Sequence, residues 1–253
     1  MRGKFGATGV LILAGVLVYL LWPNGEESEK AESSTTSAKS AGVSAPIIFR
    51  MNPGAIRIDG RPDEWREAKV PAYTARARVS GPGARLAKLT ADRARLRGVA
   101  FAHDEANLFI LFKLAGGVAK HLEQTGATGA LGYLYLDADG EADTGQLREV
   151  AGTKMGAECR IWLPTGFHGG TGKPIRPMIA YKVQTYDGQG YEEQPEGVKT
   201  SHENPGFIAF DDPFVEARIP LKVLGLSPPA KVSLYMDHMG LAGDGPLLRL
   251  RLE

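Results

Sequence analysis

The chain has 253 residues, of which 30 are basic and 29 acidic, so its formal net charge is +1. This balance, without a long block of one sign, gives no support to nucleic-acid binding. The single cysteine, Cys159, excludes an intramolecular disulfide framework, so a buried core must provide the stability.

Residues 5–22 form the first predicted element, a membrane-spanning signal anchor. They carry no charge and, at about 18 residues, just reach across the hydrocarbon of a bilayer. Arg2 and Lys4 precede them and acidic residues follow, so the positive-inside bias places residues 1–4 in the cytoplasm and the rest on the extracytoplasmic side, in a periplasm or at the cell surface. A cleaved secretory signal is the alternative, although the apolar run ends without a small-x-small site. No cysteine lies near its end to carry a lipid.

Residues 23–45 are predicted to be a flexible polar linker. They contain almost no large apolar side chains, so burial cannot offset the entropy lost on ordering. In the polar-coil regime their root-mean-square reach is roughly 25 Å. A domain beginning at residue 46 would therefore be held near the membrane surface.

Residues 46–253 are predicted to form one β-rich domain. Short β-branched and aromatic runs alternate there with Gly, Pro, Asp and Asn, which is typical of many short strands. We expect strands at residues 47–51, 55–58, 96–103, 108–114, 132–136, 157–163, 177–185, 207–210, 214–219, 232–237 and 247–252.

The hydrophobic pattern of individual runs also predicts where they lie. Residues 108–112 are apolar throughout and predict a central strand, whereas residues 215–219 and 248–252 alternate strictly, as strands with one solvated face do. Helical signal is confined to residues 63–68 and 221–224, a turn or two each. The expected fold is all-β, an antiparallel, jelly-roll-like β-sandwich.

Four sequence segments carry a resemblance to a known family. They are residues 56–65 (IRIDGRPDEW), 99–110 (VAFAHDEANLFI), 132–140 (GYLYLDADG) and 215–221 (VEARIPL). In this order and spacing the chain resembles the family 9-like carbohydrate-binding modules, β-sandwich domains related to the DOMON group. Local chemistry gives part of the first segment a structural interpretation: Asp59 and Gly60 suit a turn, Asp63 suits a helix cap, and Trp65 suits the sandwich edge.

An acidic loop follows the strand predicted at residues 132–136. Asp137, Asp139, Glu141 and Asp143 recur at every second position, so a curled loop can direct several oxygens at one hard cation. The loop is not an EF-hand, because Gly140 is its fourth residue instead of its sixth. The family resemblance implies a structural calcium ion beginning at Asp137 and Asp139. The alternative is a solvated, Asp-rich turn.

Sugar-binding members of the resembled family clamp their ligand between two tryptophans, because the C–H face of a sugar packs on an aromatic ring. Beyond residue 22 this chain has only Trp65 and Trp162, and neither stands at a clamp position. The remaining ligand-binding candidates are Trp162 itself, Tyr181 and Tyr186, with Tyr191 and Phe167 as further replacements.

These observations predict a non-catalytic, extracytoplasmic module that binds a glycan or a cell-envelope component. No nucleophile motif, phosphate-binding loop or paired histidine spacing indicates an enzyme or a zinc site. Residues 169–173 resemble a phosphate loop only in glycine content. Haem binding of the DOMON type is the alternative, with Met236, His238 and Met239 as candidate ligands, but core-filling methionines are the favoured interpretation. An envelope accessory without a small ligand is the third possibility.

Overall fold

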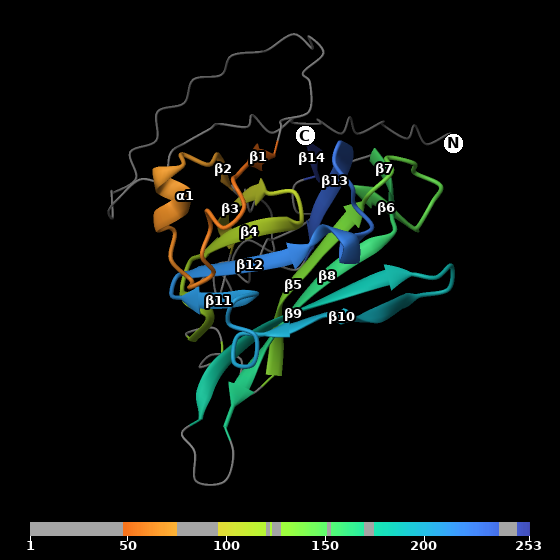
Figure 1. Ribbon diagram of the computed structural model, residues 1–253. Helices are drawn as coiled ribbons and strands as arrows, with labels where there is room; N and C mark the ends of the chain where they lie inside the picture. The colour runs from red at the N-terminus through yellow and green to blue at the C-terminus, as the bar shows by residue number, and fades with distance from the viewer. Residues whose placement is uncertain are drawn as a thin grey trace, which may run out of the picture.

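The computed structural model describes residues 48–74, 96–119, 122, 128–150, 153–169, 175–237 and 247–253 (Figure 1). The predicted anchor, residues 5–22, and the predicted linker, residues 23–45, lie outside these ranges. Within the described residues no helix is both long and apolar enough to cross a membrane.

In the described part of the chain the strands form two six-stranded sheets and one separate hairpin. The first sheet has the order β1-β3-β4-β12-β11, with β2 paired to β3. Its pairs are antiparallel except β1 with β3, which is parallel. These strands are β1 (Phe49–Arg50), β2 (Ala72–Thr74), β3 (Leu96–His103), β4 (Asn107–Leu114), β11 (Ile208–Asp211) and β12 (Phe214–Pro220).

The second sheet is antiparallel and has the order β10-β9-β8-β5-β13-β14. Its strands are β5 (Thr128–Asp137), β8 (Cys159–His168), β9 (Arg176–Tyr186), β10 (Tyr191–Thr200), β13 (Ala230–Asp237) and β14 (Leu247–Leu252). The separate hairpin joins β6 (Gln146–Val150) to β7 (Thr153–Ala157). Figure 1 shows β8 and β9 extending below the body of the domain.

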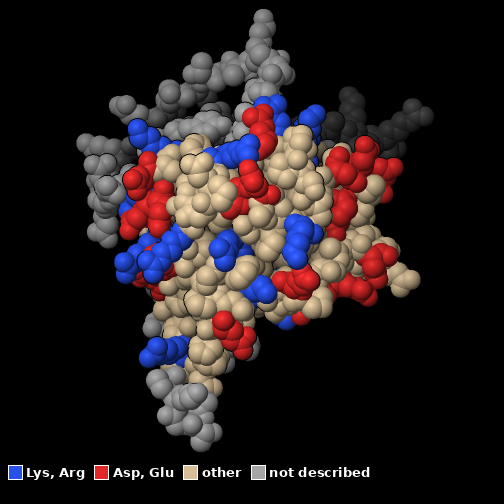
Figure 2. All heavy atoms as spheres, in the orientation of Figure 1, with Lys and Arg blue, Asp and Glu red and all other residues tan. Residues whose placement is uncertain are grey.

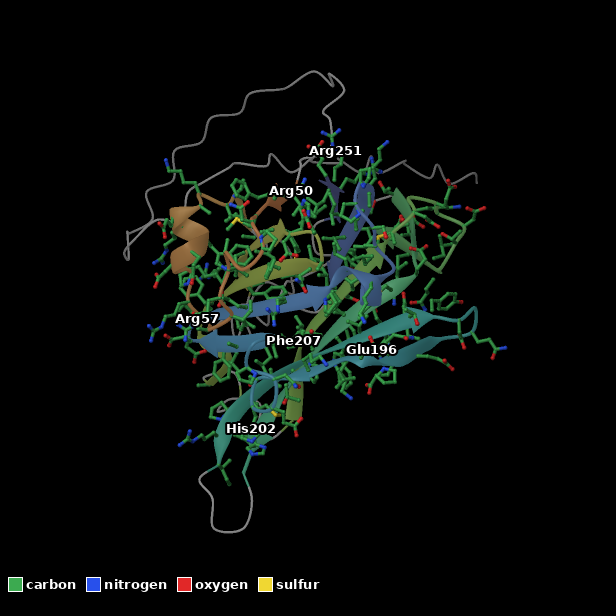
Figure 3. All side chains as sticks on the ribbon, viewed as in Figure 1. Arg50, Arg57, Glu196, His202, Phe207 and Arg251 are labelled. Atoms are coloured by element: carbon green, nitrogen blue, oxygen red, sulfur yellow. The ribbon has the colours of Figure 1, made fainter. Side chains whose placement is uncertain are left out.

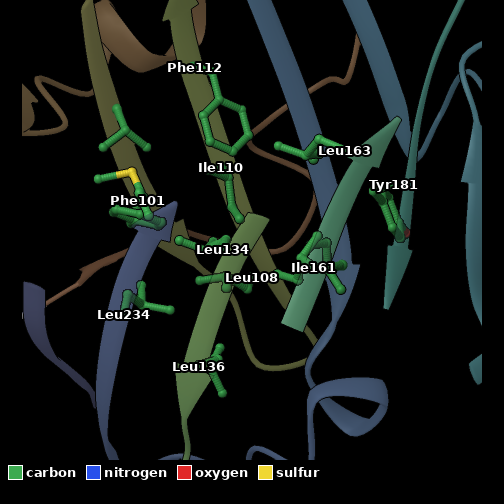
Figure 4. Packing of buried hydrophobic residues seen from close by; sticks show 14 of the residues in the cluster. Phe101, Leu108, Ile110, Phe112, Leu134, Leu136, Ile161, Leu163, Tyr181 and Leu234 are labelled. Atoms are coloured by element: carbon green, nitrogen blue, oxygen red, sulfur yellow. The ribbon is translucent and has the colours of Figure 1, made fainter. Parts of the chain in front are cut away.

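The two six-stranded sheets share one hydrophobic core. Phe101 and Ile110 of the first sheet pack in the same cluster as Leu134 and Ile161 of the second (Figure 4). These side chains are at most 2 % exposed. The prediction of an all-β, antiparallel fold is therefore confirmed, and the packing is that of a sandwich. Some consecutive strands are neighbours in a sheet, such as β3 with β4 and β8 with β9, whereas others lie in different sheets, such as β4 and β5. The jelly-roll connectivity stays a prediction.

A second cluster lies on the other side of the first sheet. Residues 51–72 cross that face, and Ile58 and Trp65 pack there against Phe109 and Leu111 of β4. The segment includes the short helix α1 (Asp63–Glu67). Consequently β4 is covered on both faces, as its apolar run predicts, and it lies between β3 and β12.

Several local expectations need correction. Residues 55–58 are not a strand: Ile56 and Ile58 alternate like one but are buried as an irregular segment over the first sheet. Asp63 begins α1 without a side-chain capping bond. Glu216 does not face solvent, since residues 51–72 cover it completely. By contrast, β14 has the predicted wet face, where Arg249 is exposed between buried leucines, and residues 221–224 form a single 3-10 turn, η1 (Leu221–Leu224).

Candidate ligand-binding face and acidic loop

The outer face of the second sheet carries a row of aromatic and basic side chains. Tyr133 of β5 pairs with Trp162 of β8, and Trp162 pairs with Lys182 of β9, so all three project from the same face. The rings of Tyr133 and Trp162 are stacked, with centroids 6.3 Å apart and planes inclined by 15°. Lys182 Nζ lies over the indole, 5.5 Å from its centroid. Tyr133, Trp162 and Lys182 are partly exposed.

A second row lies on the same face of the sheet, two residues away along each strand. Tyr135, Arg160 and Gln184 are register partners on β5, β8 and β9. Arg160 Nε donates to Gln184 Oε1 at 2.6 Å. Its guanidinium lies 5.2 Å from the ring centroid of Tyr133 and 4.3 Å from that of Tyr191. Arg160 thus joins both rows through cation–π contacts, and no ion pair links it to an acidic residue in the part of the chain that the structure describes.

Tyr186 and Tyr191 continue the face toward the β9–β10 turn. They are register partners with ring centroids 5.6 Å apart. The Tyr191 hydroxyl donates to the carbonyl oxygen of Ala157 at 2.9 Å, and burial raises the pKa of Tyr191. Tyr186 donates to the carbonyl oxygen of Gly188 at 3.0 Å and remains partly exposed. The predicted candidate Tyr186 therefore belongs to the same face as Trp162.

The β6–β7 hairpin closes one end of this aromatic face. Val150 and Met155 pack there with Tyr135 and Tyr235, all four being buried. Arg148 of β6 places its guanidinium 4.0 Å from the centroid of the Tyr135 ring. The hairpin therefore covers the β13 side, and the partly exposed rings lie toward β8 and β9.

Tyr181 does not belong to this face, which corrects the prediction that it binds a ligand. Its side chain is 0 % exposed and packs in the core between the two sheets. Its hydroxyl donates to the carbonyl oxygen of Arg218 at 2.9 Å, and burial raises its pKa. With no ring surface open to solvent, Tyr181 has a structural role.

The acidic loop brings together two predicted residues and one that the sequence analysis missed. One carboxylate oxygen from each of Asp137, Asp139 and Glu158 lies within 4.8 Å of the others. Glu158 stands between β7 and β8. Because Leu136 and Cys159 are register partners, Glu158 lies beside Asp137. No motif could have identified it, since its proximity follows from the pairing of β5 with β8.

Hydrogen bonds fix the conformation of this loop. Asp137 Oδ1 accepts from the Gly140 amide at 2.6 Å, and Asp139 Oδ1 accepts from the Glu141 amide at 2.8 Å. The Thr144 hydroxyl donates to Glu158 Oε1 at 2.6 Å. Glu141 and Asp143 are exposed and are not part of this carboxylate group, which contains Asp137 and Asp139 of the four metal ligands predicted from sequence.

Electrostatics set Asp137 apart from a simple turn residue. Burial raises its pKa to about 6, against the lowering effect of the Gly140 amide, and the neighbouring carboxylates of Glu158 and Asp139 raise it further. A cation beside the group would relieve this repulsion. Oxygen ligands from Asp137, Asp139 and Glu158 are the type that calcium prefers, although three residues supply fewer than its usual six to eight ligands.

The first resembling segment has a structural role, but Trp65 packs against β4 in the middle of the first sheet and not on the sandwich edge predicted for it. Trp65 is fully buried and donates from Nε1 to Glu216 Oε1 at 2.6 Å. The amides of Asp59 and Gly60 donate to Glu216 Oε2 at 3.0 and 2.7 Å. Gly60 has φ +86°, and a Cβ atom there would lie 2.3 Å from the backbone of Phe210. Glu216 therefore attaches the covering segment to β12.

The candidate haem ligands are not assembled within the described residues. Met236 is buried in the main core, and Met155 is buried under the β6–β7 hairpin. Met178 lies on β9, and His238 and Met239 lie outside the described ranges. Met155 and Met236 fill cores, which is the interpretation that the sequence favours.

No family model matches the chain, and no curated protein matches it. The resemblance to carbohydrate-binding modules therefore stays a prediction made from the four sequence segments. The aromatic face and the acidic loop are the two features of the structure that bear on function.

Proposed function

We propose that the chain is a non-catalytic, extracytoplasmic binding module whose ligand is a carbohydrate held on the outer face of the second sheet. The observation that carries this proposal is the cluster of partly exposed rings with interleaved cations, Tyr133, Trp162, Tyr186, Arg160 and Lys182. An anchored position on the outer side of a membrane is part of the proposal and rests on the sequence of residues 5–22.

The chemistry of this face suits a sugar in two respects. Aromatic edges and faces pack against C–H groups of a pyranose, while charged nitrogens donate to its hydroxyl oxygens. Trp162 and Lys182 supply both kinds of group on neighbouring strands. The indole N–H of Trp162 is buried and has no hydrogen-bond partner among the described residues, so it is the ring, and not this donor, that the face offers to a ligand.

Binding to a glycan array, followed by calorimetry on the glycans that bind, tests the proposal. Trp162→Ala should weaken binding by about tenfold or more, since one stacked ring contributes on the order of 1.5 kcal/mol. Ile175→Ala is the matched control, because Ile175 is 73 % exposed and lies just before β9, away from the row. Equal loss in both variants, or no glycan binding by the parent, would refute the carbohydrate assignment.

Calcium is the ion proposed for the acidic loop, with a structural role. The support is the approach of Asp137, Asp139 and Glu158 and the raised pKa of Asp137. Added calcium should raise the melting temperature of the parent chain, whereas Asp139→Asn should respond weakly. Glu149→Gln serves as the control, since Glu149 is an exposed acid on β6 outside the loop. A parent protein that melts identically with calcium and with a chelator would exclude this ion.

A further inference from the structure

The outer face of the second sheet continues beyond the aromatic row, along β8 and β9. Trp162 pairs with Lys182, and six residues further along β8, in the same register, His168 pairs with Arg176. Side chains alternate between the two faces of a strand, so His168 and Arg176 project from the face that carries Trp162 and Lys182. At about 3.3 Å per residue, the two pairs lie roughly 20 Å apart along the sheet.

A stacked pair of histidines occupies the far end of this face. The ring of His202, in the turn after β10, lies on the ring of His168, with centroids 3.4 Å apart and planes inclined by 23°. His202 is exposed and His168 is partly exposed. Figure 3 shows His202 at the level where β8 and β9 extend below the body of the domain. The pair therefore adds a second exposed ring surface, with ring nitrogens that form hydrogen bonds.

The charged residues of these two strands are all basic. β8 and β9 contain Arg160, Arg176 and Lys182 and no aspartate or glutamate. All three cations project from the outer face, since Arg160 is two residues from Trp162 along β8. Glu193 of β10 pairs with Lys182 at 2.8 Å, whereas no ion pair in the described part of the chain involves either arginine. This face therefore has an excess of positive charge.

Uncharged residues separate the aromatic row from the histidine pair. By the same alternation, Gly166 of β8 and Met178 and Ala180 of β9 project from the outer face between them. The acid nearest in sequence to the histidine pair is Glu203, whose carboxylate accepts from the Thr200 hydroxyl at 3.5 Å. In Figure 2 the lower part of the described domain shows a basic and an acidic patch with uncharged residues between them. No charged side chain of β8 or β9 thus interrupts the face between its two ends.

We propose that the outer face of β8 and β9 binds an acidic polysaccharide, with His168 and His202 as a second subsite beyond the aromatic row. This inference rests on the proposed carbohydrate binding and names the class of the sugar. Arg160 and Arg176 select carboxylate or sulfate groups, because a guanidinium donates parallel N–H bonds to such anions. Since the two ring clusters lie roughly 20 Å apart, only an extended chain contacts both.

Calorimetry on the full chain in a mild detergent tests the charge of the ligand. Oligogalacturonides, alginate oligosaccharides and sulfated dextran are each compared with an uncharged form, the ester or unsulfated dextran, at one ionic strength. At least one acidic form should bind about tenfold more tightly than its uncharged form, because it gains charge-assisted hydrogen bonds. Uncharged forms that bind as tightly would overturn this inference and leave the carbohydrate proposal standing. Failure to bind any glycan would refute both.

Chain length tests the second subsite. Long oligosaccharides of the acidic glycan that binds should bind more tightly than short ones. His202→Ala and Arg176→Met should each weaken binding of the long chains by about tenfold and leave the short ones unchanged, whereas Trp162→Ala weakens both. Arg57→Met is the matched control, since Arg57 is an exposed arginine in the segment that covers the first sheet, on another part of the domain from His202 (Figure 3).

Two outcomes would refute the second subsite. One is equal affinity of the parent chain for short and long acidic oligosaccharides. The other is unchanged affinity for the long chains in both His202→Ala and Arg176→Met. Both side chains are exposed, so neither substitution removes a core contact, and circular dichroism confirms that each variant is folded. His168→Ala provides an independent third variant with the same expected loss.

Discussion

Glu216→Gln is the substitution whose effect the structure defines most sharply. The side chain is 0 % exposed and accepts from three donors, the indole of Trp65 and the amides of Asp59 and Gly60. Glutamine keeps the size of the group but has only one acceptor oxygen. If that oxygen takes the two amides, the new NH₂ faces the indole N–H. If the glutamine side-chain amide is flipped, its oxygen accepts from the indole and its NH₂ faces the two backbone amides.

Either orientation leaves at least one buried N–H unpaired. The expected loss of unfolding free energy is therefore about 1–3 kcal/mol. Urea denaturation followed by tryptophan fluorescence and circular dichroism measures it, with an unchanged slope against denaturant as the sign of intact two-state behaviour. The measurement should be made below and above the pKa of Glu216, which burial raises to about 7.

A double-mutant cycle with Trp65→Phe isolates the indole contact. Phenylalanine has no N–H, so Glu216→Gln should cost about 1–3 kcal/mol less in that background than in the parent. Additive effects, or a Glu216→Gln variant as stable as the parent, would contradict the assignment of Glu216 as the acceptor that holds residues 51–72 on the sheet.

Three further outcomes follow from buried polar groups. Burial raises the folded-state pKa of Asp137 to about 6, so the folded chain binds a proton there more tightly than the unfolded chain, and stability falls as pH rises from about 4 to 6. In Asp137→Asn the unfolding free energy should lack this pH-dependent loss, which is about 1–2 kcal/mol after allowance for solvent screening. An identical pH profile of stability in the variant would contradict this. The Cys159 thiol, whose pKa burial raises to about 12, should resist a thiol reagent until urea unfolds the protein; rapid labelling in native buffer would show otherwise. Tyr181→Phe should lose about 1 kcal/mol in urea denaturation, because its hydroxyl no longer donates to Arg218, and an unchanged midpoint would mean that this bond adds nothing.

The strands predicted correctly from sequence are those with strong local patterning. Residues 96–103 and 247–252 coincide with β3 and β14, because apolar side chains dominate one face or both. β10 was missed: Tyr191–Thr200 is rich in Glu, Gln, Pro and Gly, which have low strand propensity, and it forms an edge strand with an irregular register. Strand pairing, not local preference, determines such an element.

Long-range pairing also explains what was missed in the candidate site. Asp137 and Asp139 are recognisable because they share one loop, whereas Glu158 joins them only through the pairing of β5 with β8. For the same reason Tyr133 stacks on Trp162, and Arg160 lies over the Tyr133 ring. Tyr181 was misplaced because a tyrosine in a strand gives no local sign of which sheet face it occupies. Glu216 is covered by a segment that is distant in sequence: Asp59, which donates to it, lies 157 residues earlier in the chain. No local pattern indicates such a contact.

One backbone hydrogen bond, from the Ile48 amide to the Arg251 carbonyl oxygen at 2.8 Å, ties the first described segment to the last strand. Chain that precedes residue 48 and anything fused after residue 253 therefore leave from one end of the domain. Figure 1 shows the β8–β9 extension at the opposite end. A C-terminal fluorophore or affinity tag would stand clear of that extension, so immobilisation through the C-terminus leaves the extension accessible.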